Sequence, residues 1–537
     1  MKKEKDNSKK VLLKGTAILS VAGLLSKILS AVYRVPFQNI VGDVGFYIYQ
    51  QVYPFYGIAV SFATYGFPVV ISKLYAEKIS IGDTRAAKNI LFPAFVSVST
   101  ICLLIFLVIY FGSTFFARLM GDPRLEPLLK MVSLTFLIIP LVSVMRGHFQ
   151  GQVFMAPTAI SQLGEQIVRV SLILILAFLL TAKGFTLYGI GKWTMFASVV
   201  GSLCGAMILV AFFIHHHHQS QIHFWNSIKG SVKIMKMVWT EGIAVCISSL
   251  TLLLFQLADS FQMVPLLKES GMALTEAQVM KGIYDRGQPL VQLGMVLAIS
   301  LSLSVVPFVA AMKRKSEEMT GYIRFAFQLS LVVSSAATTG LILIMNDLNV
   351  MLFENEWGSN VLRIFVLIVF FATICTTIIS VLQGLDITYF PACIVIVGFF
   401  VKLLFNRFFI LKWGTMGAAI ASNLALLLMA VILIYRLRKT IDTRLVNWRF
   451  VIVLIKSLTI MTITISLFFM ISRVFAPLFH GVRLFSAFVA ICAAVIGAIV
   501  FFISIIRGCI FSKEEIILLP FGSRLQFLLK EGRVNRD

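Results

Sequence analysis

The chain has 537 residues, of which 59% are hydrophobic and only 13% are charged. A soluble domain has about 25% charged residues, so this composition excludes a soluble enzyme with a small membrane anchor. It also excludes an outer-membrane β-barrel, whose strands alternate in hydropathy around a polar lumen. The composition predicts an all-α polytopic membrane protein.

The net charge of +23 would suggest a nucleic-acid partner if the protein were soluble. In a helical membrane protein, Lys and Arg gather in cytoplasmic loops and set the topology, so we expect no nucleic-acid partner. The seven cysteines have neither metal-ligand spacing nor the pattern of a disulfide framework. We therefore expect no metal site.

Fourteen apolar segments follow one another along the chain, and a bilayer crossing takes about 20 residues. They cover residues 13–33, 46–74, 88–117, 129–148, 157–182, 187–213, 238–262, 288–312, 321–345, 361–384, 391–411, 415–435, 450–472 and 483–506. The first is expected to be a retained helix, because no clear signal-peptide cleavage site follows it. Lys and Arg concentrate in the loops after even-numbered segments, which predicts a cell-membrane protein with cytoplasmic N- and C-termini.

An internal repeat is indicated by landmarks that recur at a nearly constant spacing. Gln150-Gly151 recurs as Gln383-Gly384, and Pro157 recurs as Pro391. Two parallel repeats of six helices are a known transporter plan, with the substrate path between them. The predicted organisation is an N-terminal lobe (1–215), a cytoplasmic linker (216–236), a C-terminal lobe (237–440), helices 13 and 14 (441–509) and an amphipathic cytoplasmic tail (510–537). The linker begins near four consecutive histidines. Such a tract could bind metal, but we expect a solvated linker.

Basic residues inside the apolar segments are the first candidates for a functional site. A Lys or Arg at a helix centre costs about 2.5–3.5 kcal/mol on insertion scales, so such residues line cavities, pair with partners or lie at helix ends. The candidates are Lys27, Arg34, Arg169, Arg286 and Lys402. For Arg286, a position at the membrane interface is the alternative. Arg and Lys bind phosphate well, so the set predicts a cationic cavity for an anionic substrate such as a lipid pyrophosphate.

Three carboxylates are candidates for ion coupling or, alternatively, for structural roles: Glu165, Glu241 and Asp259. Glu165 and Arg169 are at i and i+4, a spacing that permits an intrahelical ion pair. The sequence contains no nucleotide-binding, zinc-protease or serine-hydrolase motif. We therefore expect no enzymatic activity, no catalytic residue and no cofactor. Coupling to Na⁺, H⁺ or the membrane potential is left open.

Four stretches resemble the polysaccharide-flippase branch of the multidrug/oligosaccharidyl-lipid/polysaccharide exporter superfamily. They are KGTAILSVAGLLSKILSAVYRVPF (14–37), GFPVVISKLYAE (66–77), MRGHFQGQVFMAPTAISQLGEQIVRV (145–170) and YDRGQPLVQLGMVLAISLSLSVVPF (284–308). The nearest groups are SpoVB-like and YabM-like, and the MurJ group of lipid II flippases is more distant. The resemblance implies two lobes in a V around a cationic cavity, with helices 13 and 14 forming a groove for a lipid tail.

The resemblance also implies a function. Members move undecaprenyl-pyrophosphate-linked sugars, lipid II among them, from the inner to the outer leaflet for cell-wall, polysaccharide or sporulation pathways. The functional arginines of the MurJ group match Lys27, Arg34 (one residue displaced) and Arg286 here. The second helix departs from that group, because VYPFYGIAVSFATYGFP (52–68) has no charge. The implied partners are a lipid-linked oligosaccharide and membrane lipids, and we expect a monomer that works alone or with cell-envelope synthesis proteins.

Two other functions remain as alternatives. A cation-coupled multidrug exporter of the same superfamily generally has twelve helices and an acidic cavity, whereas basic residues outnumber acidic ones in the apolar segments here. A membrane-embedded transferase would need a large outside loop with carboxylates or His, and no loop of that kind is predicted.

Overall fold

The computed structural model describes residues 2–216, 228–296, 316–441, 445–472, 474, 481–508 and 510–511. The regular structure of these residues is helical, with no strand among them. Helices suit a bilayer because their backbone N–H and C=O groups are bonded within the segment. Ten helical runs in these ranges are long and apolar enough to cross a membrane, or eleven when the bent pair Val232–Ser249 and Thr251–Glu269 counts as one span.

Two of those runs are too long for one crossing: Ile18–Ser80 has 63 residues and Tyr389–Ile441 has 53. A helix rises 1.5 Å per residue, so about 20 residues already cross the hydrocarbon core. Each run contains a break, and counting each as two raises the eleven spans to thirteen. The eighth predicted segment, 288–312, lies mostly outside the described residues. The structure is therefore consistent with the predicted fourteen helices.

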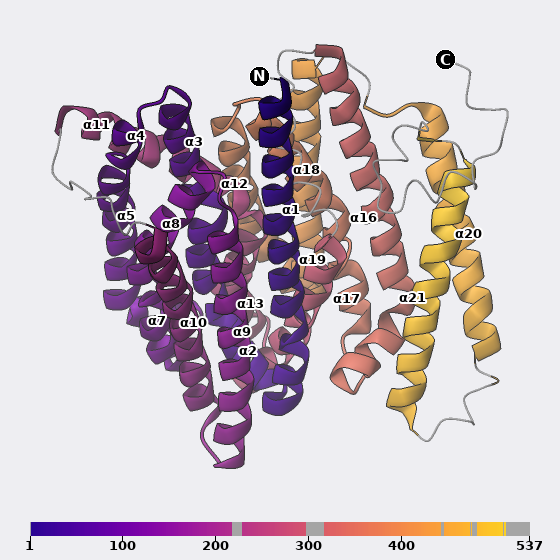
Figure 1. The fold of residues 1–537 in the computed structure, drawn as a ribbon. Coiled ribbons are helices and arrows are strands. Elements are labelled where there is room, and N and C mark those ends of the chain that lie inside the picture. The colour runs from indigo at the N-terminus through magenta and orange to yellow at the C-terminus, as the bar shows by residue number, and fades with distance from the viewer. Residues whose placement is uncertain are drawn as a thin grey trace. The chain divides into compact units, whose positions relative to one another are not determined.

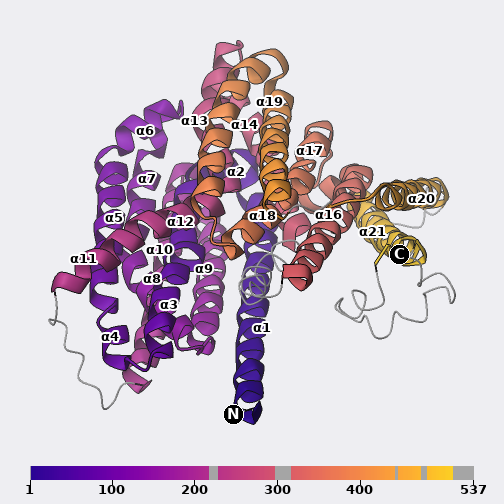
Figure 2. The same cartoon turned by 90° about the horizontal axis from the view of Figure 1, so that it is seen from above.

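Met1–Val296 and Asp386–Met429 form one compact unit. Its described elements are α1 (Lys2–Val32), α2 (Arg34–Ser61), η1 (Phe62–Gly66), α3 (Phe67–Ser80), α4 (Thr84–Lys88), α5 (Leu91–Phe111), α6 (Ser113–Leu119), η2 (Pro123–Leu125), α7 (Glu126–Ser133), α8 (Thr135–Gly151), α9 (Ala156–Ala182), α10 (Leu187–His216), α11 (Ile228–Met237), η3 (Val238–Gly242), α12 (Ile243–Ser249), α13 (Thr251–Glu269), α14 (Leu274–Asp285) and most of α19 (Tyr389–Ile441). Helices α9 and α10 run side by side, and α1 packs against α9 (Figures 1 and 2).

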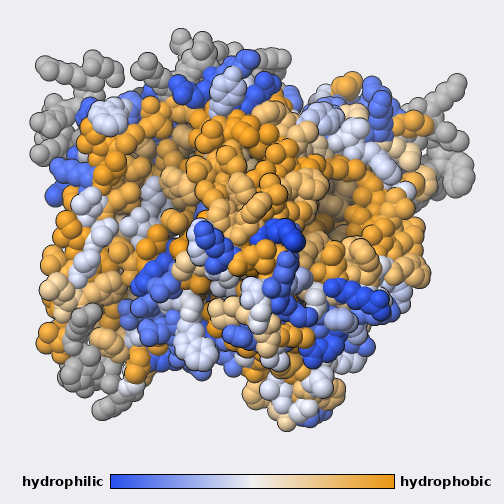
Figure 3. Space-filling model, turned by 180° about the vertical axis from the view of Figure 1, so that it is seen from behind, coloured by the Kyte–Doolittle hydropathy of each residue, from blue (hydrophilic) through white to orange (hydrophobic). Residues whose placement is uncertain are grey.

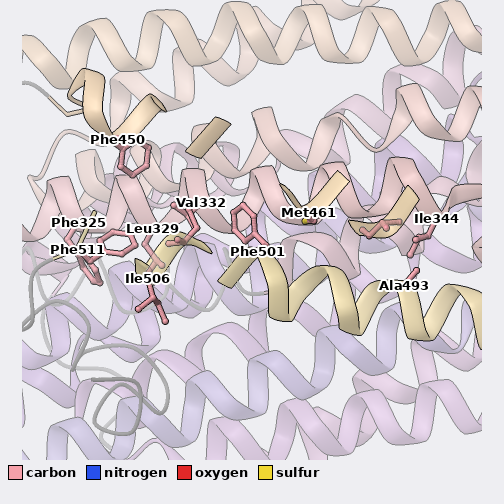
Figure 4. Close-up of a cluster of buried hydrophobic side chains, with 12 residues drawn as sticks. Phe325, Leu329, Val332, Ile344, Phe450, Met461, Ala493, Phe501, Ile506 and Phe511 are labelled. Atoms are coloured by element: carbon pink, nitrogen blue, oxygen red, sulfur yellow. The ribbon is translucent and has the colours of Figure 1, made fainter. Parts of the chain in front are cut away.

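Leu297–Leu385 and Ala430–Asp537 form a second unit. Its described helices are α16 (Ser316–Phe353), α17 (Ser359–Phe365), α18 (Ile368–Gly384), the end of α19, α20 (Trp448–Ser472) and α21 (Val482–Arg507). Apolar side chains of α16, α20 and α21, among them Leu329, Met461 and Phe501, form its core (Figure 4). Helices α20 and α21 are the predicted helices 13 and 14. The predicted lobe boundaries, 1–215 and 237–440, stay a prediction.

Glycines mark the breaks within the long runs. Helix α2 breaks at Gly42, whose φ is +70°, and α19 breaks at Trp413-Gly414, where the φ of Gly414 is +55°. Glycine adopts such angles readily because it has no Cβ. The segments η1 and η3 are π-helical, and single turns of π-helix are frequent at functional sites.

Large apolar side chains are exposed along the long helices. Examples are Phe111 of α5, Ile214 of α10 and Met470 of α20, at 76%, 60% and 70% exposure. Figure 3 shows broad apolar areas on one face of the molecule. Soluble monomers rarely expose apolar patches of more than a few hundred Å². Together with the spans, this surface identifies a multi-pass membrane protein.

Two predicted features lie at or beyond the limits of the described residues. His215 and His216 end α10, whereas the rest of the histidine tract is outside the described ranges. The predicted amphipathic tail is also outside them, apart from residues 510–511. In the described part of the chain, no group of three or more His, Cys, Asp or Glu could hold a metal ion.

Candidate anion-binding site

Two buried arginines lie where α1, α2 and α9 meet. Arg34 is the first residue of α2, and Arg169 lies in α9. The Cζ atom of Arg34 is 4.2 Å from the ring centroid of Tyr53. The Cζ atom of Arg169 is 4.7 Å from the ring of Tyr56 and 5.2 Å from that of Tyr33. These are cation–π contacts, in which the ring face attracts the guanidinium group.

The rings form a tyrosine cage, made of Tyr33, Tyr49, Tyr53 and Tyr56. Three of them lie at i, i+4 and i+7 of α2 and therefore share one face of that helix. Tyr33 lies at the junction of α1 and α2, and its hydroxyl is 2.8 Å from that of Tyr49. All four are buried. The part of α2 that carries Tyr49, Tyr53 and Tyr56 thus contributes aromatic rings to the site, and the charge comes from Arg34 and Arg169.

Neither cage arginine has a carboxylate within 4.0 Å among the described residues. Three nitrogens of Arg34 and Nη1 of Arg169 are buried without a hydrogen-bond partner. Arg169 Nε donates to Gln166 at 2.8 Å and Nη2 to Ser30 at 3.4 Å. A buried charge is costly unless it is paired and hydrogen-bonded. This pair of guanidinium groups therefore forms an electrostatically favourable place for an anion.

Lys27 lies in α1, close to this cluster. Its Nζ is 5.2 Å from the ring centroid of Tyr65, in η1. The neighbouring Ser26 carbonyl accepts a hydrogen bond from Gln166, which also accepts from Arg169. Arg34 and Arg169 thus share the tyrosine cage, whereas the side chain of Lys27 contacts Tyr65. The roles of all five predicted basic residues in substrate binding stay a prediction.

Glu165 does not pair with Arg169, although the sequence spacing permits that pair. Its Oε2 is 2.9 Å from Nη2 of Arg146, in α8, and both side chains are buried. Its Oε1 accepts from Ser202 at 3.1 Å and from Tyr56 at 3.5 Å. Tertiary packing therefore provides a different partner from the one that helix periodicity permits.

Arg286, which follows the last residue of α14, binds a carboxylate of α2. It contacts Asp43 through three hydrogen bonds of 2.7, 2.8 and 2.9 Å. Gly282 lies one turn earlier on the same face and packs against the backbone of Asp43. Gln278 lies two turns earlier and donates a hydrogen bond to Asp122 at 2.8 Å. Through Gln278, Gly282 and Arg286, this face of α14 packs against residues of the segment 1–215.

The other face of α14 contacts α13, which is linked in turn to α19. Lys402 of α19 is 2.7 Å from Asp259 of α13, and its ammonium group also donates to Ser422 at 2.6 Å. Asp259 accepts further hydrogen bonds from Asn406 at 3.1 Å and from Tyr284 of α14 at 3.0 Å. Lys402 and Asp259 are therefore a buried, well-bonded ion pair.

Glu241 of η3 lies at a more exposed position. Its carboxylate is 3.9 Å from Nζ of Lys73 in α3, and the same ammonium group is 3.7 Å from Asp386. The three side chains are 28%, 49% and 64% exposed, respectively. Exposed ion pairs of this kind contribute about 0–1 kcal/mol.

Sequence reasoning missed two residues that complete these contacts. Arg146 lies inside the fourth predicted segment, so the search for basic residues within apolar segments could have found it. Asp43 lies between two segments, where a carboxylate gives no comparable signal. Only the fold shows that Asp43 meets Arg286, because 243 residues separate them.

Comparison with known proteins places this geometry in context. A family model described as polysaccharide biosynthesis protein matches residues 12–313. An uncharacterized membrane protein of Bacillus subtilis (strain 168), YabM, is 39% identical over 528 residues, which cover 97% of each chain. The lipid II flippase MurJ of the same organism is 25% identical over 559 residues, covering 97% of this chain and 99% of its own.

A solved structure has the same fold. The lipid II flippase MurJ in an inward closed conformation superposes with a TM-score of 0.65 at 17% identity, covering 91% of this chain and 100% of that one.

Proposed function

Because the chain belongs to the polysaccharide biosynthesis protein family, we propose that it is a flippase for an undecaprenyl-pyrophosphate-linked sugar precursor. It moves this precursor from the inner to the outer leaflet by alternating access, and lipid II is the first cargo to test. The observation that carries the proposal is the pair of buried guanidinium groups, Arg34 and Arg169, without a carboxylate partner among the described residues.

The charge and the donors of this pair suit a pyrophosphate. A pyrophosphate diester between a lipid and a sugar carries two negative charges, which the two arginines match. Guanidinium groups bind phosphate oxygens through a planar fork of N–H donors. Four nitrogens of the pair are buried without an acceptor. The tyrosine cage attracts the arginines without neutralising them, so an arriving phosphate displaces no carboxylate.

We further propose a cell-membrane location with cytoplasmic termini, which the distribution of Lys and Arg among the loops supports, and an outward transport direction. Moving one elementary charge across the membrane potential involves about 2.3 kcal/mol per 100 mV. A potential that is negative inside therefore favours export of an anionic cargo. Glu241 and Asp259 already pair with Lys73 and Lys402, which favours the membrane potential over Na⁺ or H⁺ as the coupling. The proposed monomer needs no cofactor and performs no catalysis.

The test uses cells whose known lipid II flippases can be switched off. The full chain is expressed in them, and a headgroup-cleaving enzyme is added outside to measure how much lipid II is accessible. We expect the wild-type protein to restore accessibility. Arg34→Met and Arg169→Met should each reduce lipid II accessibility to background while membrane abundance stays normal, because each removes one of the two positive charges within the tyrosine cage.

A matched control is Arg407→Met. Arg407 lies on α19 and is 63% exposed beside Glu269, so its loss should leave accessibility unchanged. Full lipid II accessibility in both the Arg34→Met and the Arg169→Met variants would contradict the proposed site. No accessibility with wild-type protein present in the membrane would exclude lipid II as the cargo.

A further inference from the structure

Arg169 has a potential internal partner that it does not use. Glu165 precedes it by one helical turn, and a carboxylate and a guanidinium at i and i+4 form ion pairs on helices. An ion pair there would neutralise one of the two charges that the proposed function assigns to pyrophosphate. The structure instead directs the carboxylate to Arg146, on a different helix.

The carboxylate of Glu165 is held by donors from three helices. Arg146 of α8 contacts Oε2, whereas Ser202 of α10 and Tyr56 of α2 contact Oε1. The Nη2 group of Arg146 also donates to Ser161 at 3.1 Å, and Nη1 donates to the Ala63 carbonyl at 3.1 Å. Arg146 is thus itself fixed by η1 and α9, and it places its charge against Glu165.

Close packing of α10 encloses the same segment of α9. A Cβ added at Gly205 would lie 3.2 Å from Cβ of Glu165, and one added at Gly201 would lie 2.8 Å from Cβ of Arg169. Only glycine at these positions lets the two helices approach so closely. The α10 side of Glu165 therefore offers little space. Without Arg146, the cation that the helical spacing offers to its carboxylate is Arg169, one turn along α9.

The charges of the four groups follow from this arrangement. Arg146 and Glu165 neutralise each other, and Arg34 and Arg169 keep both of their positive charges. Without Arg146, the buried carboxylate would lack its cationic partner, and Arg169 would be the guanidinium one turn away. The site formed by Arg34 and Arg169 would then have one net positive charge.

We propose that Arg146 is a positioning residue that sequesters Glu165 and so keeps Arg169 available for the pyrophosphate group of the cargo. This inference rests on the proposed function and adds to it a residue that does not contact the cargo. Its role is electrostatic: it determines which cation Glu165 neutralises.

The test compares four purified full-length proteins in detergent: wild type, Arg146→Met, Glu165→Gln and the double variant. Binding of inorganic pyrophosphate is measured by calorimetry at low salt. Arg146→Met should bind roughly 10- to 100-fold more weakly, the size of one charge-assisted hydrogen bond. Glu165→Gln should bind as well as wild type, and the double variant should return to within about threefold of wild type because no carboxylate is left to occupy Arg169.

A purely structural role of Arg146 gives a different result. The double variant would then bind as weakly as Arg146→Met, and that outcome overturns the inference, as does wild-type binding by Arg146→Met. Absence of binding by the wild-type protein overturns both the inference and the proposed function. Recovery in the double variant, with wild-type binding intact, supports both.

Removing one partner of a buried ion pair is destabilising, so Arg146→Met requires a companion that leaves Arg146 in place. Gln166→Glu is nearly isosteric and puts a carboxylate on the residue that already accepts from Arg169 Nε at 2.8 Å. It should weaken pyrophosphate binding to the same extent as Arg146→Met. Wild-type affinity in Gln166→Glu would overturn the inference even if Arg146→Met does not fold.

Discussion

The contact between Arg286 and Asp43 allows a direct test of how α14 is held against α2. Asp43→Asn keeps the shape of the side chain but removes its charge. Arg286 is fully buried and makes three hydrogen bonds to this carboxylate. The substitution therefore removes the negative charge that faces this buried guanidinium group across the contact between α14 and α2.

The size of the effect follows from burial. Breaking a buried ion pair by removing one partner costs about 3–5 kcal/mol. The side chain of Asp43 is 16% exposed, so the lower end of that range applies, about 3 kcal/mol. At 1.4 kcal/mol for each factor of ten, the equilibrium between attached and detached α14 should shift roughly 100-fold towards the detached form.

Hydrogen–deuterium exchange of the full-length protein measures this shift. Backbone amides of a helix exchange faster when it detaches locally. We expect faster uptake in peptides that cover residues 274–290 and 38–48, and unchanged uptake in α20 and α21. Arg286→Met combined with Asp43→Asn should return most of the protection, because replacing a whole buried pair by uncharged groups is often nearly neutral.

The matched control is Glu126→Gln. Glu126 pairs with Lys130 at 2.8 Å within α7, and these side chains are 31% and 42% exposed. Loss of such an exposed, solvent-screened pair has little effect on stability, so uptake should hardly change. Unchanged uptake around α14 in Asp43→Asn, or an equal change in the control, would refute the reasoning.

Two further substitutions test buried contacts by the melting temperature of the purified protein. Lys402→Met leaves Asp259 buried without its cation and should cost about 3–5 kcal/mol, whereas adding Asp259→Asn should recover most of the loss; equal melting temperatures of single and double variants would contradict this. Gly66→Ala places a methyl group where Cys246 Sγ lies and should cost about 1–3 kcal/mol by overpacking. Adding Cys246→Ala should relieve most of that cost, and no relief would show that the overlap is not the cause.

The fold class and the family were predictable from sequence, and both predictions are confirmed. The reason is that hydropathy alone determines which segments enter a bilayer, so fourteen apolar segments indicate fourteen helices. Resemblance of several ordered stretches then indicated the family. Neither inference depends on which helix faces which.

Ion-pair partners were not predictable in the same way. Helix periodicity permitted an ion pair of Glu165 with Arg169, but Arg146 reaches Glu165 from another helix. Arg169 and Lys402 are separated along the chain by the same number of residues as Gln150 and Gln383 of the predicted repeat, and both are buried. One is nevertheless enclosed by tyrosines, and the other binds Asp259. Sequence patterns identify which charges are buried, whereas the choice of partner depends on distances between helices.

The tyrosine cage has a consequence for the step of the transport cycle on which the membrane potential acts. Rings leave the formal charge of Arg34 and Arg169 intact, so under the proposed function the empty carrier has two positive charges at its site, and the loaded carrier is close to electroneutral there. A nearly neutral complex experiences little force from the field as it turns outward. The field acts mainly on the empty carrier and draws its two guanidinium groups back towards the negative interior. The work of the potential is thus done on the return of the carrier, after the cargo has left.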